Sequence, residues 1–195
     1  MTDVGIIKAF LVDLDGTLAD TSEANFRAYA AALAEVGVTV DRPTFDREAF
    51  GRNWRQFLPT LMARAGSNAE PQAVAQRKTA LYRETIAHAR FNEALLLLLQ
   101  TRRPGVRVAL VTTASSANVA SVLGQRPDIA ALFDLLVTGD DVRQHKPDPE
   151  AYVLAAQRLG VAPHECVVVE DSDIGMAAGR AFGAPVLRVS METAA

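Results

Sequence analysis

The sequence has little cysteine and no long apolar segment, and each shortage excludes a class of protein. Cys166 is the only cysteine among 195 residues, so no disulfide can form within the chain, as is typical of proteins from reducing compartments. Apolar runs such as Ala94–Leu99 are far shorter than the roughly 20 residues that span a bilayer. Residues 1–5 lack the pattern of a secretion signal. We therefore expect a cytoplasmic protein with no membrane partner.

The chain also lacks an excess of positive charge. Its 20 basic and 23 acidic residues give a net charge of −3, which argues against nucleic acid as the main partner. Hydrophobic residues make up 49% and charged residues 22%, a balance typical of a folded globular protein. The sequence does not specify an oligomeric state, and a monomer is the default expectation.

Short apolar segments rich in β-branched residues predict five buried strands, at residues 8–12, 106–111, 135–137, 166–169 and 186–189. Helical periodicity predicts helices over 117–123, 150–159 and 174–182, and Gly160 and Gly183 stand where C-caps are expected. Because strands and helices alternate, we expect an α/β fold: a doubly wound parallel sheet with helices on both faces.

Residues 20–90 interrupt this alternation with helical patterns alone. Apolar stripes begin near Phe26, Phe57 and Val74, and prolines separate them. We expect residues 1–19 and 91–195 to form the catalytic core and residues 20–90 to form an inserted α-helical cap. A cap of this size should have little core of its own and should pack on the sheet. It holds 10 basic and 8 acidic residues, hence +2, against −5 elsewhere.

Polar residues follow the predicted strands at the points where these strands end. In a doubly wound sheet the ligand site lies at the carboxyl ends of the strands, so these residues should converge on one edge. In chain order they are Asp13 and Asp15, Thr112 and Thr113, Lys146, and Glu170 and Asp171.

These residue types suit phosphoryl transfer. Asp13 and Asp15 alternate along an extended segment, so one can attack a phosphorus while the other meets the leaving oxygen. Carboxylates that face a phosphate require a cation, and oxygen ligands favour Mg²⁺. The Thr112 hydroxyl and the Lys146 ammonium would stabilise charge on the transferring phosphoryl group.

Four motifs in this order resemble those of the haloacid dehalogenase superfamily, in the branch with a helical cap after the first motif. The resemblance covers nearly the whole chain and implies a Rossmann-like catalytic core. The motifs are DxDGT at residues 13–17, Thr112 at a strand end, Lys146-Pro147, and the Glu-Asp-Ser segment with its following helix at residues 170–179.

The resemblance also implies a role for each motif residue. Asp13 would be the nucleophile and a Mg²⁺ ligand, and Asp15 the general acid–base, with its backbone carbonyl on the metal. True dehalogenases of the superfamily lack the second aspartate, so Asp15 indicates phosphoryl transfer. The other implied roles are a metal ligand at Asp171, support of the metal shell by Glu170, and phosphoryl binding by Thr112 and Lys146.

The resemblance favours a Mg²⁺-dependent phosphatase that acts on a small phosphorylated metabolite through an aspartyl-phosphate. A β-phosphoglucomutase-like phosphomutase is the first alternative, because residues 20–29 resemble those enzymes. Asn25 stands where they usually have a histidine and Thr17 where they can have an apolar residue, which favours the phosphatase. A non-catalytic phosphate-binding protein is the second alternative. Such descendants commonly lose Asp13 or Asp171, and this chain retains both.

The segment from Phe50 to Gln56 is the part of the cap in which we expect substrate contacts. Arg52 or Arg55 would bind a second anionic group, and Trp54 would pack against the substrate body. The alternative is a helix start with solvated arginines and a core tryptophan. The sequence supports the two interpretations about equally.

Some assignments at the strand ends have a close competitor. Thr112 directly follows the apolar run, but Thr113 can provide the hydroxyl instead, and we place it with Asn25 among the substrate-binding candidates. Asp173 is expected to cap the helix that follows it. Asp140 and Ser172 are expected to serve in local turns and caps.

Overall fold

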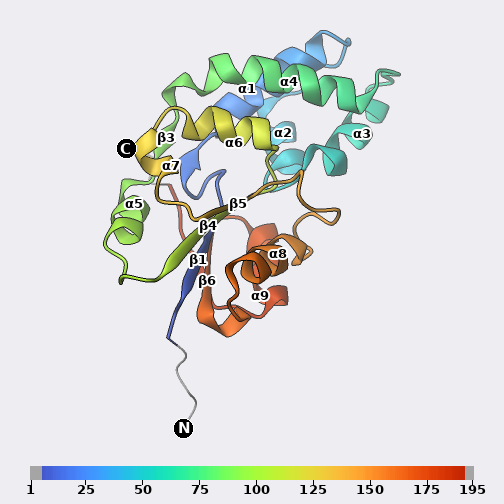
Figure 1. Ribbon diagram of the computed structural model, residues 1–195. Helices are drawn as coiled ribbons and strands as arrows, with labels where there is room; N and C mark the ends of the chain where they lie inside the picture. Colours follow the sequence, from blue (N-terminus) through green and yellow to red (C-terminus); the bar gives the residue numbers. More distant parts are fainter. Residues whose placement is uncertain (1–5, 192–195) are drawn as a thin grey trace.

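The computed structural model describes residues 6–191, in which a parallel sheet lies below a group of helices (Figure 1). All neighbouring strands of this five-stranded sheet are parallel, which confirms the predicted α/β fold class. In spatial order the strands are β5 (Leu135–Val137), β4 (Arg107–Val111), β1 (Ala9–Val12), β6 (Cys166–Glu170) and β7 (Val186–Arg188).

Side chains of the central strand β1 enter two different cores, because successive residues of a strand face opposite sides of the sheet. Leu11 packs in a cluster with residues of α8 and α9, whereas Val12 packs in a cluster with residues of α5 and α6. Both faces are therefore covered. The helices are α5 (Glu93–Gln100), α6 (Ser116–Leu123), α7 (Pro127–Ala130), α8 (Glu150–Leu159) and α9 (Asp173–Phe182), with a 3₁₀ turn η2 (Pro163–Glu165).

The ends of the core helices follow ordinary capping rules. Gly160 and Gly183 end α8 and α9 in the left-handed conformation, with φ of 65° and 89°, as predicted. Ser172 is the N-cap of α9, because its hydroxyl accepts a hydrogen bond from the Gly175 N–H at 3.0 Å. The prediction that Asp173 caps this helix is wrong. Its side chain is exposed and lies 3.3 Å from the Arg188 guanidinium.

Within residues 20–90, the chain forms four α-helices. The sequence predicted three of them and missed α2, because Phe45 is its only buried residue and no apolar stripe forms. The helices are α1 (Ser22–Ala34), α2 (Arg42–Ala49), α3 (Trp54–Arg64) and α4 (Pro71–Thr85), followed by a 3₁₀ turn η1 (Ile86–His88).

These four helices have an apolar core of their own, so the expectation that the insert would have little core is wrong. Tyr29 packs against Phe57 and Phe45, with ring centroids 5.2 and 5.5 Å apart. Helices α1 and α4 also contribute to the core above the sheet, as expected. Their residues in that second cluster are Ala24, Ala28 and Tyr82.

A two-stranded antiparallel ribbon stands where the chain enters and leaves this helical group. It pairs β2 (Ala19–Asp20) with β3 (Arg90–Phe91), and Arg90 Nη2 lies 2.7 Å from Asp20 Oδ2. Strands of two residues have no periodicity, so the sequence did not predict them. The ribbon thus joins the segment that enters the helical group to the segment that leaves it, 70 residues later in the chain.

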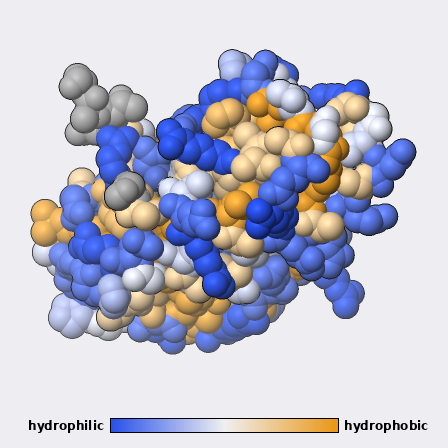
Figure 2. All heavy atoms as spheres, turned by 90° about the horizontal axis from the view of Figure 1, so that it is seen from above, coloured by the Kyte–Doolittle hydropathy of each residue, from blue (hydrophilic) through white to orange (hydrophobic). Residues whose placement is uncertain are grey.

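The outer surface is mainly hydrophilic in the view from above, with hydrophobic atoms in separated patches (Figure 2). Within residues 6–191, no helix is both long and apolar enough to cross a membrane.

Candidate active site

Lys146 is the centre of a buried charge cluster at the carboxyl ends of β1, β4 and β6. Its Nζ donates hydrogen bonds to Asp13 Oδ1 at 2.7 Å, to Glu170 Oε1 at 2.6 Å and to the Val111 carbonyl at 3.0 Å. Only 2% of the Lys146 side chain is exposed. Burial opposes its charge, but Asp13 and Glu170 hold the pKa of Lys146 well above its ordinary value. The ammonium therefore stays charged and fixes both carboxylates.

Glu170 has hydrogen-bond partners on both carboxylate oxygens. Tyr152 donates to Oε1 at 3.1 Å, and the Ser172 hydroxyl and N–H donate to Oε2 at 3.0 and 3.2 Å. Burial opposes its ionisation, but Lys146 and these hydrogen bonds hold the pKa of Glu170 below its ordinary value. A Cβ at Gly175 would overlap this carboxylate, so glycine is required there. These contacts suit a supporting role for Glu170.

Gly16 and Thr17 explain why the first motif continues beyond its aspartates. Gly16 has φ of +87°, and a Cβ at this position would overlap the Asp171 carboxylate. The Thr17 hydroxyl donates to Asp171 Oδ1 at 3.0 Å. Glycine therefore permits a close approach of the loops after β1 and β6, and threonine holds them together.

The carboxylates of Asp13, Glu170 and Asp171 fit a divalent cation. Each offers one oxygen, and these oxygens lie within 4.8 Å of one another. Burial and the charge of Glu170 raise the pKa of Asp13 well above its ordinary value and that of Asp171 to about 6. The cluster thus holds three carboxylates, of which Lys146 contacts two, and an all-oxygen donor set with excess negative charge suits Mg²⁺. No side-chain oxygen of Asp15 belongs to this cluster among the described residues.

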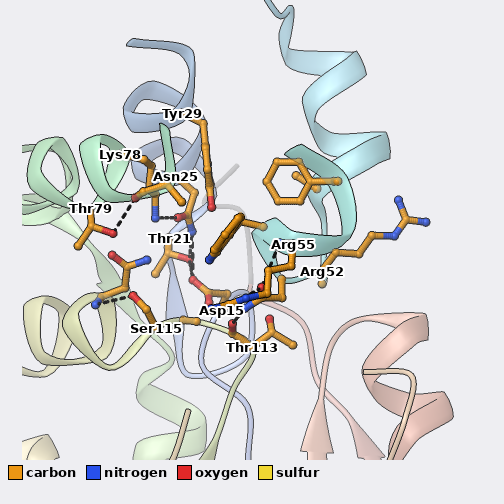
Figure 3. Close-up of a pocket in the computed structure, with 18 of the residues that line it drawn as sticks. Asp15, Thr21, Asn25, Tyr29, Arg52, Arg55, Lys78, Thr79, Thr113 and Ser115 are labelled. Atoms are coloured by element: carbon orange, nitrogen blue, oxygen red, sulfur yellow. Dashed lines mark hydrogen bonds between the residues drawn. The ribbon is translucent and has the colours of Figure 1, made fainter. Parts of the chain in front are cut away.

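Asp15 is instead held by residues of the helical insert (Figure 3). Thr21 and Asn25 donate hydrogen bonds to Asp15 Oδ1, the latter at 3.1 Å. Asn25 in turn accepts a hydrogen bond from Lys78 Nζ at 2.7 Å. A continuous hydrogen-bonded chain therefore joins α4 to the loop after β1.

Lys78 is a residue of the site that sequence reasoning missed. Only 1% of it is exposed, and its Nζ lies 3.9 Å from the centroid of the Tyr82 ring and 4.9 Å from that of Tyr29. Burial lowers the pKa of Lys78 to about 7. A signal was present, because Lys78 follows Val74 by four residues and therefore lies within the apolar stripe of its helix.

A cavity of about 420 Å³ lies between the core and the helical insert. Asp15 and Thr113 belong to its walls, whereas Asp13, Thr112, Lys146, Glu170 and Asp171 do not. All the predicted cap contacts do, namely Asn25, Arg52, Trp54 and Arg55.

The two arginines of the predicted contact segment differ in their environment. Arg52 Nη1 donates to the Glu48 carbonyl at 2.8 Å at the end of α2, and Figure 3 shows its guanidinium directed away from the other labelled side chains. This geometry favours the solvated alternative for Arg52. The Arg55 guanidinium stacks on the Trp54 ring, 4.5 Å from its centroid, and both line the cavity. Arg55 and Trp54 therefore remain candidates for substrate contact.

Thr112 and Thr113 occupy different environments at the end of β4. Thr112 is buried, and its hydroxyl accepts a hydrogen bond from the Ala114 N–H at 3.1 Å. Thr113 lines the cavity, and its carbonyl accepts a hydrogen bond from Asn53 Nδ2 at 2.8 Å. The competition between these two threonines therefore stays open, with Thr113 the nearer to the cavity.

Asn53 and Gln56 connect the insert to the core, and sequence reasoning missed both. Asn53 reaches Thr113, and Gln56 Nε2 donates to the Lys146 carbonyl at 3.1 Å. The same two residues form the capping box of α3, in which the Asn53 N–H donates to Gln56 Oε1 at 2.8 Å. The Asn-x-x-Gln spacing is typical of a helix start and could be recognised in the sequence. The contacts of these two side chains with the core could not be predicted from it.

Fold and site together define a class of protein: an α/β core with a buried, acidic, metal-compatible site beneath inserted helices. The chain belongs to the haloacid dehalogenase-like hydrolase family, which matches residues 7–183. It is similar to fructose-1-phosphate phosphatase YqaB of Escherichia coli, with 30% identity over 93% of this chain and 95% of that one. It is also 34% identical to hexitol phosphatase A of Escherichia coli, over 94% of this chain and 83% of the relative.

Solved structures lead to the same family. CbbY from Rhodobacter sphaeroides, in complex with phosphate, superposes with a TM-score of 0.88 at 26% identity, over 96% of this chain and 88% of that one. A mutant of CbbY has also been solved in complex with xylulose-(1,5)bisphosphate. The homologues are thus sugar phosphatases of this superfamily, with phosphomutases as the alternative activity.

Proposed function

We propose that the chain is a Mg²⁺-dependent phosphatase that hydrolyses the phosphomonoester of a small sugar through an aspartyl-phosphate. The observation that carries this proposal is the separation of the two aspartates. Lys146 holds Asp13 beside the acidic cluster, while Thr21 and Asn25 hold Asp15 at the cavity wall. The relatives named as phosphatases of phosphorylated sugars support the substrate class.

The first half of the reaction uses both aspartates. Lys146 engages Asp13 Oδ1, so the other carboxylate oxygen attacks the phosphorus. The ester P–O bond breaks, and the leaving alkoxide takes a proton from Asp15. In the second half a water molecule attacks the aspartyl-phosphate and gives its proton to Asp15. The bond between Asp13 and phosphorus then breaks and releases orthophosphate.

The surrounding residues hold charge and exclude water. Asp13, Asp171 and the Asp15 backbone carbonyl would hold Mg²⁺, with Glu170 in support. The bound ion would neutralise the negative charges of phosphate and carboxylates. We propose that the Lys146 ammonium, the hydroxyl of Thr112 or Thr113, and the Arg55 guanidinium bind the phosphoryl group.

The helical insert would cover the reaction. We propose that residues 20–90 act as a cap on a core of residues 1–19 and 91–195, and that closure excludes water from the site. The net charge of −3 and the single cysteine further support a cytoplasmic enzyme without nucleic acid or membrane partners. A monomer suffices, because each proposed role falls on a residue of one chain.

The test is phosphate release from p-nitrophenyl phosphate and from a panel of sugar phosphates, with and without Mg²⁺. We expect wild-type turnover that is lost on chelation and reduced at least about a thousandfold in Asp13→Asn. Equal activity of the two proteins would exclude Asp13 as the nucleophile. Conversion of β-glucose 1-phosphate to glucose 6-phosphate with a bisphosphate primer would instead identify a phosphomutase.

A further inference from the structure

The loop that carries Lys146 receives a hydrogen bond from the helical insert. Gln56, in the first turn of α3, donates from Nε2 to the Lys146 carbonyl at 3.1 Å. We propose that Gln56 is a positioning residue: its amide holds the Lys146 backbone and so makes the binding of the phosphoryl group depend on the contact of α3 with the core. This inference rests on the proposed function, because it concerns an ammonium to which that binding is assigned.

The side chain of Lys146 is committed at its charged end. An ammonium has three N–H donors, and here all three are in use, on Asp13, Glu170 and the Val111 carbonyl. The ammonium can bind a phosphoryl oxygen only if it shares or leaves one of these acceptors. The position of the Lys146 backbone sets the reach of the ammonium, so a small displacement changes how well it meets the phosphoryl group.

The backbone of Lys146 has no other hydrogen bond within residues 6–191. Its N–H and its carbonyl take part in no backbone–backbone bond there, and Pro147 after it has no N–H to donate. The loop is held before this point by Glu150, whose carboxylate accepts from the N–H groups of Arg143 and Gln144 at 3.1 and 2.7 Å. Gln56 therefore supplies the hydrogen bond that fixes the loop at the lysine itself.

The start of helix α3 does not by itself require an amide at Gln56. Its Oε1 accepts from the Asn53 N–H at 2.8 Å in the capping box, while its Nε2 donates to the Lys146 carbonyl. A glutamate would complete the same capping box, and its charge would suit the N-terminus of a helix. Only an amide can accept from the Asn53 N–H and donate to the Lys146 carbonyl at once.

Asn53 makes a second contact of the same kind. It is the N-cap of α3, and its Nδ2 donates to the Thr113 carbonyl at 2.8 Å. The first turn of α3 thus holds one carbonyl in the loop after β4 and one in the loop after β5, and these loops carry residues that we propose bind the phosphoryl group. Gln56 does not line the cavity. It therefore acts through Lys146 and not through contact with the substrate.

The experiment removes the donor and keeps the helix cap. Gln56→Glu retains an oxygen for the Asn53 N–H but places a carboxylate against the Lys146 carbonyl. Because Gln56 is exposed, the new charge is not buried. We expect kcat/KM for p-nitrophenyl phosphate at saturating Mg²⁺ to fall about tenfold, and the inhibition constant of orthophosphate to rise severalfold, because the ammonium is displaced from the phosphoryl group. The melting temperature should stay within a few degrees of the wild type.

Two further variants separate position from charge. Gln125→Glu makes the same exchange in the core, where Gln125 donates to the Ser121 carbonyl at 3.4 Å outside the cavity, and it should leave both constants unchanged. Gln56→Met removes the donor without adding a charge, and its kcat/KM should fall to within a factor of about three of that of Gln56→Glu.

Each result decides for or against the role of Gln56. Wild-type kcat/KM in Gln56→Glu or in Gln56→Met overturns the inference and leaves the proposed phosphatase standing. A fall in the activity of Gln56→Glu that accompanies a large loss of melting temperature also overturns it, because Gln56 would then be a capping residue only. No Mg²⁺-dependent hydrolysis by the wild type overturns both the inference and the proposed function.

Discussion

The active site has two parts: a floor formed by Asp13, Lys146, Glu170 and Asp171, and a wall formed by the residues that line the cavity. The polar groups of these two parts are satisfied in different ways. On the floor, charged groups are buried and paired with one another, as in the contacts of Lys146 with Asp13 and Glu170. On the wall, amides and aromatic rings line an open cavity, and Asn118 Oδ1 has no partner among the described residues. The floor is complete without a substrate body, whereas the wall is not. We therefore assign the chemistry to the floor and specificity to the wall, to which both the core and the helical insert contribute residues.

The largest effect should come from removing the charge at the centre of the floor. Lys146→Met leaves two buried carboxylates without their common partner, so we expect kcat/KM to fall at least about a thousandfold and the unfolding free energy to fall by about 3–5 kcal/mol. Phosphate release and urea unfolding measure the two quantities.

Lys8→Met is the matched control for Lys146→Met. It breaks an exposed pair with Glu165, so the unfolding free energy should change by less than about 1 kcal/mol. If Lys146→Met is as active and as stable as this control, the floor does not depend on its ammonium.

The second prediction separates backbone strain from the close approach at the floor. Gly16 and Gly105 both have φ of +87°, but only at Gly16 would a Cβ overlap the Asp171 carboxylate. Alanine at either position should lower the unfolding free energy by about 1 kcal/mol or more. Gly16→Ala alone should also lower kcat, by roughly a hundredfold, because Asp171 must move.

Steady-state kinetics of the two glycine variants decide this point. Equal kcat values for Gly16→Ala and Gly105→Ala would show that the contact with Asp171 has no part in catalysis.

The third prediction addresses the contact between the helical insert and the core. Asn53→Ser keeps an N-cap for α3 but is too short to reach the Thr113 carbonyl. We expect kcat/KM to fall about tenfold, because the contact segment is less well positioned, while the melting temperature stays within a few degrees. A large loss of melting temperature with unchanged kinetics would instead mark Asn53 as a capping residue only.

The smallest effect concerns Lys78, whose pKa burial lowers to about 7. Above this pH the folded protein binds fewer protons than the unfolded chain, in which lysine titrates near its ordinary value, so stability should rise from pH 7 toward pH 10. Below pH 7 the ammonium is charged in both states and its burial cost is present in full.

Melting temperatures from pH 6 to pH 9 test this dependence. The wild type should gain several degrees relative to Lys78→Met over this range. Parallel curves for the two proteins would show that Lys78 keeps an ordinary pKa in the folded state.

A structural feature of this protein could be predicted from the sequence when residues close together in the chain determine it. Strands such as β6 and caps such as Gly160 follow from patterns within a few residues, and they were predicted nearly to the residue. Helix α2 was missed because one buried phenylalanine makes no stripe. The cap core was underestimated, because aromatic residues from three helices meet in it and no single segment reveals that meeting.

The sequence by itself determined the class of the protein and the residues at the strand ends. The carboxyl ends of parallel strands lie at one edge of the sheet, so Asp13 and Asp171 were expected to meet once the strands were recognised. Lys146 lies in the loop between β5 and α8, and only the fold of that loop brings it to Asp13. Only the tertiary structure decided which partner each polar group has. Lys78 reaches Asn25 across 53 residues, and Asp140 reaches Ser116 across 24. Such pairings depend on how helices pack, and packing is a property of the whole chain.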